Sequence, residues 1–284
     1  MPKVALITAK VVKPPHHDPD MSPMLAALGE HDVHASAVCW DDDEVEWGSF
    51  DLAILRSTWD YVDRYDEFFD WLTQTEQLVP VQNPSSTVRW STNKRYLEDL
   101  ESHGLPTVET RFIDPGDPVV VPDWPELVVK PAIGAGAKDA ARHSSTDDAV
   151  QHVRRLVDAN RTAMVQPYLE SVDHYGETGL VYFNGAFSHA FKKDALLQSR
   201  PQPSDGLFAI ETIETREPAD DELALAEAVV ETFGSDLLYA RIDVVRDRTG
   251  SAVVLEVELA EPSFFLEASG AGAEGFARAV LERL

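Results

Sequence analysis

Short apolar runs alternate with amphipathic stretches along the first third of the chain. The runs have the length of strands, and the stretches between them repeat their apolar positions at helical spacing. This pattern predicts strands at Lys3–Ala9, His34–Trp40, Asp51–Arg56 and Val79–Asn83, with helices at Met24–Glu30 and Tyr65–Leu78. Strands that are separated by helices usually pair in parallel, so we expect a small parallel α/β sheet. Such sheets bind ligands beyond the carboxyl ends of their strands, which directs attention to the segment Arg56–Tyr61.

The remaining two thirds of the chain predict a second module rich in hairpins. The run Asn83-Pro-Ser-Ser-Thr ends the first unit, and a helix over Asn93–His103 is expected to stop at Gly104. Strands are predicted at Val108–Ile113, Leu127–Ile133, Ala163–Leu169, Tyr239–Arg246 and Ala252–Leu259, and a hairpin at Leu180–Phe183 and Ala186–Phe191 around the turn Asn184-Gly185. Helices are predicted at Asp147–Ala159, Asp220–Phe233 and Glu274–Leu284, and a polar loop at Gln198–Asp205.

Acidic residues gather on the last predicted hairpin. Side chains alternate along a strand, so Arg241 and Asp243 share one face of the first strand, and Glu256 and Glu258 share one face of the second. Three carboxylates beside one guanidinium repel one another unless a cation joins them, and oxygen-only donors suit Mg²⁺. The alternative is a solvated sheet face in an acid-rich protein. The apolar residues that alternate with the acids favour the metal site.

Lysines are rare in the chain, and several of them follow features that suit phosphate binding. Lys130 ends an apolar strand and precedes a small-residue loop that contains Gly134 and Gly136, whose backbone N–H groups could cover phosphates. Lys94 lies on a predicted helix, and the pair Lys192-Lys193 ends a hairpin strand. Taken singly, each lysine is more typical of an exposed surface position than of a ligand site. The loop is not a Walker motif, because no G-x-x-x-x-G-K-[ST] sequence occurs.

A third candidate segment runs from Gln166 to Leu169 through Pro167 and Tyr168. Pro167 keeps part of this strand end out of regular pairing, so backbone groups beside Tyr168 and Leu169 could contact the edge of an adenine ring. A plain strand end is the alternative interpretation.

The order of these motifs resembles that of the ATP-grasp ligases over about residues 83–270, and the opening α/β unit is similar to the domain that precedes the module in that family. The resemblance implies an α/β fold, α+β in its ATP-grasp part, with a Rossmann-like pre-ATP-grasp domain at 1–83 and a two-lobed module at 84–284. The lid lobe with the glycine loop is expected at about 108–195, and the C-terminal lobe with the metal site at about 196–284. The chain departs from the family by placing Glu258 where Asn is common.

The same resemblance implies a role for each candidate residue. It assigns Lys94 and Lys130 to the α- and β-phosphates of ATP, Lys192 to the γ-phosphate and Glu177 to the ribose. It further implies that Arg241 faces the reacting carboxylate, that the loop with Gly134 and Gly136 forms the lid, that Gln166, Pro167, Tyr168 and Leu169 hold adenine, and that Asp243, Glu256 and Glu258 hold Mg²⁺, with Mn²⁺ as the alternative. Within the glutathione-synthetase-like branch of the family, Arg56, Ser57, Thr58, Trp59 and Ser263 are expected to bind substrate.

The resemblance therefore predicts a carboxylate–amine ligase that activates a small amino-acid-like carboxylate as an acyl phosphate for attack by an amine. An intramolecular cyclo-ligase of the O-ureidoserine type and an ATP-binding module without turnover are the alternatives. Phosphorylation of a carboxylate brings two anions together, so the site must neutralise charge and exclude water.

Composition narrows the partners of the 284-residue chain. Its 50 acidic and 24 basic residues give a net charge of −26, which disfavours binding to nucleic acid or to anionic membranes. The only cysteine, Cys39, excludes an intramolecular disulfide, and no apolar run reaches the length of a membrane span. We expect a cytoplasmic enzyme, compatible with homo-oligomerisation, whose partners are small carboxylates and amines. Because ATP is an anion, Lys94, Lys130 and Lys192 should face one common site.

Overall fold

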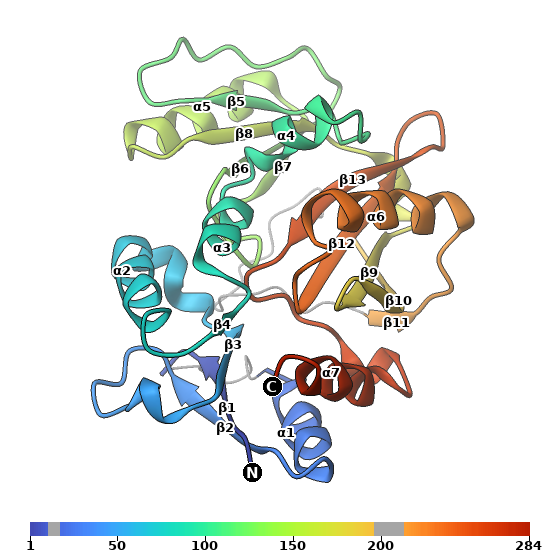
Figure 1. Ribbon diagram of the computed structural model, residues 1–284. Helices are drawn as coiled ribbons and strands as arrows, with labels where there is room; N and C mark the ends of the chain where they lie inside the picture. The colour runs from blue at the N-terminus through green and yellow to red at the C-terminus, as the bar shows by residue number, and fades with distance from the viewer. Residues whose placement is uncertain (11–17, 196–212) are drawn as a thin grey trace.

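The computed structural model describes residues 1–10, 18–195 and 213–284. Within them, three sheets form the framework of the molecule: a parallel N-terminal sheet, a small antiparallel sheet and a larger C-terminal sheet. In Figure 1 the N-terminal sheet lies at the bottom, the small sheet at the top, and the C-terminal sheet at the right. This is the mixed α/β architecture that the sequence predicts.

The N-terminal sheet has the strand order β2-β1-β3-β4, and all its neighbours pair in parallel, as predicted. Every residue of β3 is buried, which explains its continuous apolar run. The elements of this unit are β1 (Lys3–Thr8), α1 (Met21–Glu30), β2 (His34–Cys39), the 3₁₀ turn η1 (Trp47–Ser49), β3 (Leu52–Ser57), the 3₁₀ turn η2 (Trp59–Asp63), α2 (Tyr65–Thr75) and β4 (Val81–Gln82).

Two short helices, α3 (Ser85–Thr92) and α4 (Tyr96–Ser102), stand where the sequence predicts one helix from Asn93. Pro84 precedes the first residue of α3, so proline marks the start of a helix and not only the end of the first unit. Asn93 leaves the helical path and bridges to Ile133, and the backbone N–H of Lys94 donates to the carbonyl of Ala132 at 2.9 Å. The break therefore places Lys94 beside the small sheet.

The small sheet has the order β5-β8-β6-β7 and is antiparallel throughout. Helix α5 covers one face through a core that includes Val129, Val153 and Val165. The three-residue strand β7, which follows the glycine loop, is absent from the sequence-based prediction. The elements are β5 (Arg111–Ile113), β6 (Leu127–Pro131), β7 (Ala141–His143), α5 (Thr146–Asp158) and β8 (Ala163–Pro167).

The C-terminal sheet has the order β11-β10-β9-β12-β13. Its β9–β10 hairpin turns through Asn184 and Gly185 with φ values of 47° and 76°, as the Asn-Gly signal predicts. The elements are the 3₁₀ turn η3 (Glu170–Asp173), β9 (Glu177–Phe183), β10 (Ala186–Lys193), β11 (Ile213–Thr215), α6 (Asp220–Phe233), β12 (Tyr239–Arg246), β13 (Ala252–Glu258), the 3₁₀ turn η4 (Leu266–Ala268) and α7 (Gly272–Leu281).

Sheet membership corrects the expected boundary between the two lobes. The lid lobe was expected to extend to about residue 195, but β9 pairs with β12 over six residue pairs, so β9 and β10 belong to the C-terminal sheet. The boundary therefore falls between β8 and β9. The predicted polar loop at Gln198–Asp205 lies outside the described residues.

One hydrophobic core joins the N-terminal sheet to the C-terminal lobe. Leu6 of β1 and Leu28 of α1 belong to the same buried cluster as Phe183, Phe264 and Phe276. Figure 1 shows α7 beside α1 at the base of the C-terminal lobe. Among the described residues, no helix combines the length and the apolar character needed to cross a membrane.

Candidate active site

A pocket of about 620 Å³ lies where the three sheets meet. The N-terminal unit contributes Trp59 and Tyr61 to its wall, the small sheet contributes Lys130 and the glycine loop, and the C-terminal sheet contributes the acidic hairpin. A cavity of this size can enclose a nucleotide together with a small second ligand.

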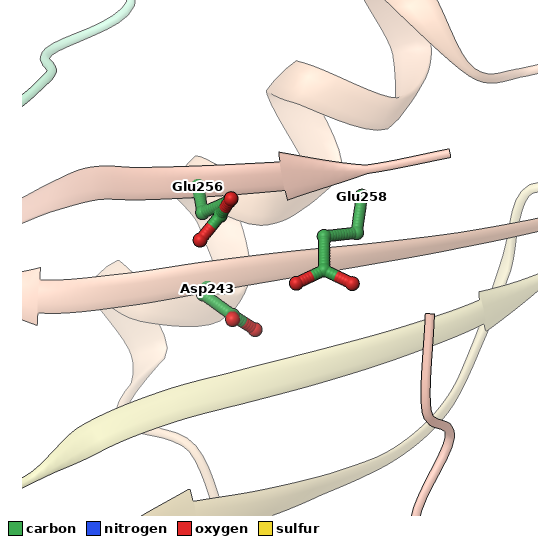
Figure 2. Close-up of side chains that lie close together, drawn as sticks. All are labelled: Asp243, Glu256 and Glu258. Atoms are coloured by element: carbon green, nitrogen blue, oxygen red, sulfur yellow. The ribbon is translucent and has the colours of Figure 1, made fainter. Parts of the chain in front are cut away.

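Three carboxylates converge on one face of the β12–β13 hairpin. Asp243 pairs with Glu256 across the two strands, and each of the three residues, Asp243, Glu256 and Glu258, offers one oxygen within 4.8 Å of the others (Figure 2). Asp243 is fully buried, and the side chains of Glu256 and Glu258 are only 24% and 26% exposed. The alternative of a solvated sheet face is therefore wrong.

Arg241 and Lys193 compensate the charge of Asp243. The Arg241 Nε and Nη2 groups donate to the two Asp243 oxygens at 2.9 Å each, and Nη2 also donates to Glu258. Lys193 Nζ lies 2.7 Å from Asp243 Oδ2 and 3.1 Å from Glu177 Oε2. These contacts hold the pKa of Asp243 below its ordinary value, although burial alone raises it.

The pKa values of the two glutamates of the cluster are shifted in opposite directions. Lys94 Nζ lies 2.8 Å from Glu256 Oε1, and Lys94 with Lys130 lowers the pKa of Glu256 against the effect of burial. Burial, together with the charges of Glu256 and Asp243, raises the pKa of Glu258 to about 8. Each of the three carboxylates offers one oxygen within 4.8 Å of the others. An oxygen-only donor set of this kind fits Mg²⁺ or Mn²⁺.

Lys193, and not Lys192, points into the pocket, which corrects the sequence-based choice between the pair. Neighbouring residues of a strand face opposite sides, and β10 directs Lys193 toward Asp243. Lys192 Nζ lies 2.8 Å from Asp194 on the other face and is not part of the pocket wall. The sequence-based prediction ended this strand at Phe191, whereas β10 continues to Lys193. It therefore chose the lysine that faces away from the pocket.

Lys94 and Lys130 do reach the common pocket. Lys94 Nζ also donates to the carbonyl of Gly134 at 2.9 Å, which fixes the start of the glycine loop. Burial lowers the pKa of Lys130, and no carboxylate among the described residues forms an ion pair with it. Lys130 is therefore a half-buried ammonium that an anionic ligand could neutralise.

The glycine loop crosses the pocket between the small sheet and the N-terminal unit. Gly136 and Ala137 adopt left-handed backbone conformations with φ of 60° and 57°. Lys138, at the end of the loop, donates to both oxygens of Asp63 at 2.6 and 2.9 Å. Because Asp63 ends η2 of the N-terminal unit, this pair connects the loop to the opposite wall of the pocket.

An apolar slot forms the other end of the pocket, beside the strand end of β8. Pro167 and Leu169 line it together with Val128, Val172 and Leu255. The side chain of Gln166 is engaged, since its amide donates to Thr110 at 2.9 Å, and the Tyr168 ring lies under the Arg142 guanidinium at 3.5 Å. A slot with apolar walls and a polar rim suits a planar heterocycle.

Three of the expected substrate-binding residues lie outside the pocket wall. Arg56, Ser57 and Thr58 are completely buried, because β3 continues to Ser57 and ends inside the interface with the C-terminal lobe. Arg56 Nη1 donates to the carbonyl of Pro262 at 2.8 Å, and its guanidinium lies 4.1 Å from the Phe264 ring centre. Arg56 therefore supports the substrate side of the pocket without lining it. Trp59 and Ser263 do line the pocket.

The sequence-based analysis missed Tyr61, Glu261 and Asp20. The Asp20 carboxylate accepts the backbone N–H groups of residues 264, 265 and 266 at 2.7, 3.1 and 2.8 Å. Tyr61 lies inside the segment that was singled out, but the interpretation stopped at Trp59. Asp20 follows Asp18, and Glu261 follows Glu258, in a chain rich in acids, so spacing alone does not single out either residue.

Comparisons with known proteins agree with this geometry. A family model described as "D-cycloserine synthetase DcsG, N-terminal domain" matches residues 4–83. The cycloserine biosynthesis protein DcsG of Streptomyces lavendulae is 37% identical over 301 aligned residues, which cover 99% of this chain and 98% of the relative.

Solved structures give the same picture. The crystal structure of D-cycloserine synthetase DcsG superposes with a TM-score of 0.89 and 36% identity, covering 99% of both chains. The D-alanine–D-alanine ligase of Bacillus anthracis, solved with ATP, has a TM-score of 0.72 at 15% identity and covers 99% of this chain and 97% of its own. At that identity the second likeness shows the fold alone.

Proposed function

The chain belongs to the ATP-grasp ligases, in the family of the cycloserine biosynthesis protein DcsG, and on that premise we propose that it closes the ring of an O-ureidoserine. In this reaction ATP phosphorylates the substrate carboxylate, and the nitrogen bound to the side-chain oxygen of the same molecule attacks the acyl phosphate. Phosphate leaves with the pair of electrons of the broken C–O bond, and the nitrogen loses its proton. The new ring contains five atoms, as the ring of cycloserine does.

One observation carries the proposal: Glu256 and Glu258 line the same pocket as Arg241, Lys94, Lys130 and Lys193, and the fully buried Asp243 lies beside them. A polyphosphate and a carboxylate repel each other, so a site that joins them needs cations on both sides of the reacting atoms. The identity to the DcsG relative, across nearly the whole length of both chains, supports ring closure over the intermolecular reaction.

The position of each residue in the pocket indicates its role in the proposed reaction. Lys130 and Lys94 are placed to hold phosphate oxygens under the glycine loop, and Lys193 to meet the phosphoryl group beside Asp243. Arg241 Nη1 donates to the carbonyl of Ser263 at 2.9 Å, so its guanidinium lies at the substrate side, where it would stabilise the oxyanion of the tetrahedral intermediate. The glycine loop, linked across the pocket by Lys138, would keep water from the acyl phosphate.

The carboxylates of Asp243, Glu256 and Glu258 would hold Mg²⁺. When bound, this ion neutralises phosphate charge during transfer.

The deciding experiment supplies MgATP with each enantiomer of O-ureidoserine and no second amine. We expect ADP to form only when the acid is present, and mass spectrometry to detect a product lighter than the acid by one water. If water then hydrolyses the carbamoyl group to carbon dioxide and ammonia and leaves a hydrogen on the ring nitrogen, the product is lighter by one water and one HNCO. A dipeptide that forms only with an added amino acid would show an intermolecular ligase instead. ATP binding without ADP release across a broad panel of acids would show a binding module.

A pair of variants tests the site within the same assay. Asp243→Asn removes one charge from the cluster and should abolish the metal-dependent formation of ADP while the protein stays folded. Asp236→Asn changes an exposed aspartate outside the pocket and should leave the rate unchanged. Equal rates for both variants would contradict the assignment of the cluster.

A further inference from the structure

One carboxylate of the pocket has no cationic partner among the described residues. Glu177 and the three acids of the cluster each pair with a lysine or with Arg241 within 4.0 Å. Glu261 lines the same pocket and is only 8% exposed, but no Lys, Arg or His side chain described in the structure reaches that distance from it. A carboxylate that is removed from water without a counter-ion is costly, so Glu261 is suited to receive a cation from a ligand.

Glu261 lies at the end of the pocket away from the apolar slot. Along β13, Leu255 faces the slot and Glu256 and Glu258 belong to the acid cluster, while Glu261 follows three residues later, beyond the end of the strand. Its neighbours come from η2 of the N-terminal unit. The Tyr61 hydroxyl donates to the Glu261 carboxylate, and Trp59 Nε1 lies 3.4 Å from the Glu261 carbonyl. A ligand at this end would therefore lie past the reacting carboxylate and away from the nucleotide.

The loop that carries Glu261 is fixed from several directions. The Tyr239 hydroxyl donates to the carbonyl of Ala260 at 2.6 Å, and Arg56 donates to that of Pro262. Asp20 accepts three successive backbone N–H groups just beyond, at residues 264–266. These hydrogen bonds fix the backbone on both sides of Glu261, so its carboxylate is already in position before a ligand binds. Binding of a cation therefore costs little conformational entropy.

We propose that Glu261, together with Tyr61 and Trp59, binds the cationic amino group of the substrate and thereby selects α-amino acids over acids without an amino group. The inference deepens the proposed function, because O-ureidoserine carries such a group beside the carboxylate that reacts. Glu261 is a specificity residue in this assignment. Phosphorylation and ring closure depend on the cluster and on Arg241, while Glu261 determines which acid is held in place for them.

The test compares two acids and two proteins. The acids are O-ureidoserine and 3-(carbamoylaminooxy)propanoic acid, which lacks only the amino group, and the proteins are the unmodified chain and Glu261→Gln. A charged hydrogen-bonded pair of this kind is worth about a 10- to 100-fold preference in kcat/KM for the amino acid, measured as ADP release. In E261Q we expect that preference to shrink to within about threefold, through a higher KM for O-ureidoserine, with the constants for the other acid nearly unchanged.

Two further variants separate recognition from structure. Glu267→Gln alters an exposed acid of η4 that lies outside the pocket, and should keep the full preference. Tyr61→Phe keeps the carboxylate but removes its donor, and should retain a preference for the amino acid while changing its KM. The melting temperature of each variant shows whether the fold is intact.

The outcomes distinguish this inference from the proposed function. If E261Q keeps the full preference, or if it lowers kcat equally for both acids, the amino-group assignment is wrong. If the unmodified chain uses a different amino acid, the same comparison is made with that acid and its deaminated analogue. If it turns over no acid, the proposed function fails, and calorimetric Kd values of the unmodified chain and E261Q for the two acids still decide the inference.

Discussion

Replacement of Lys193 by Met should damage the protein far more than the same change at Lys192. The two lysines are neighbours on β10, but they face opposite sides of the sheet. Lys193 Nζ contacts Asp243 at 2.7 Å and Glu177 at 3.1 Å, and all three side chains are largely buried. Lys192 contacts the half-exposed Asp194 at 2.8 Å. The pair is a matched comparison of the same substitution inside and outside the pocket.

The structure sets the expected magnitudes. Loss of one partner from a buried ion pair costs about 3–5 kcal/mol, because the other charge stays buried without compensation. We assign this range to Lys193→Met, which leaves Asp243 with Arg241 alone and Glu177 with no lysine. A surface pair contributes about 0–1 kcal/mol, which is the range for Lys192→Met. A domain stability of about 5–15 kcal/mol allows both variants to remain folded at room temperature.

Urea unfolding followed by circular dichroism measures the two losses, and ADP release measures activity. Lys193→Met should lose ADP formation as well as stability, whereas Lys192→Met should keep both close to those of the unmodified chain. Mg²⁺ should recover part of the stability of Lys193→Met, since a bound cation replaces some of the missing charge at Asp243. Equal losses in the two variants, or a larger loss for Lys192→Met, would refute the assignment of Lys193 to the pocket.

Three further predictions test other parts of the molecule. The pKa of Glu258 is raised from an ordinary 4.5 to about 8, so the folded chain binds this proton more tightly than the unfolded chain does. With EDTA present to remove metal, the free energy of unfolding should therefore fall as the pH rises from about 4.5 to about 8. Urea titrations should show that Glu258→Gln flattens this fall. Asp20→Asn weakens three hydrogen bonds to the loop that carries the substrate side of the pocket, and should cost about 3 kcal/mol and raise the substrate KM; an unchanged KM would contradict the support role. Gly179→Ala would place a Cβ 2.3 Å from the Phe191 ring and should lower stability by about 1–3 kcal/mol or more, whereas Gly29→Ala, with open space around it in helix α1, should raise stability by up to about 1 kcal/mol; calorimetric melting that shows no difference between them would contradict the packing argument.

The acidic hairpin could be located from sequence because strand geometry leaves few choices. Once Arg241 and Asp243 lie on one strand and Glu256 and Glu258 on the next, alternation decides which face they share. The apolar residues between them then identify that face as the one opposite the core. The same rule failed at Lys192 and Lys193. One of two adjacent lysines must face the pocket, and only the register of β10 with β9 and β11 decides which one does.

Residues that act through long-range contacts could not be assigned from sequence. Arg56 follows a strand at the edge where ligands usually bind, but its guanidinium contacts Pro262, 206 residues later. Asp20 and Glu261 depend in the same way on the docking of the N-terminal unit against the C-terminal lobe. Local patterns predict elements and faces, while contacts between units depend on how those faces pack.

The core shared by α1 and α7 has a consequence during synthesis. The ribosome releases Met24 and Leu28 of α1 roughly ten seconds to a minute before it releases Phe276 and Val280 of α7, at about 5–20 residues per second. Throughout that interval the apolar face of the N-terminal unit lacks its cover, so chaperones or other nascent chains can bind it. Residues 4–83 match a family model of their own. The apolar face of this unit is nevertheless covered only after α7 has been synthesised.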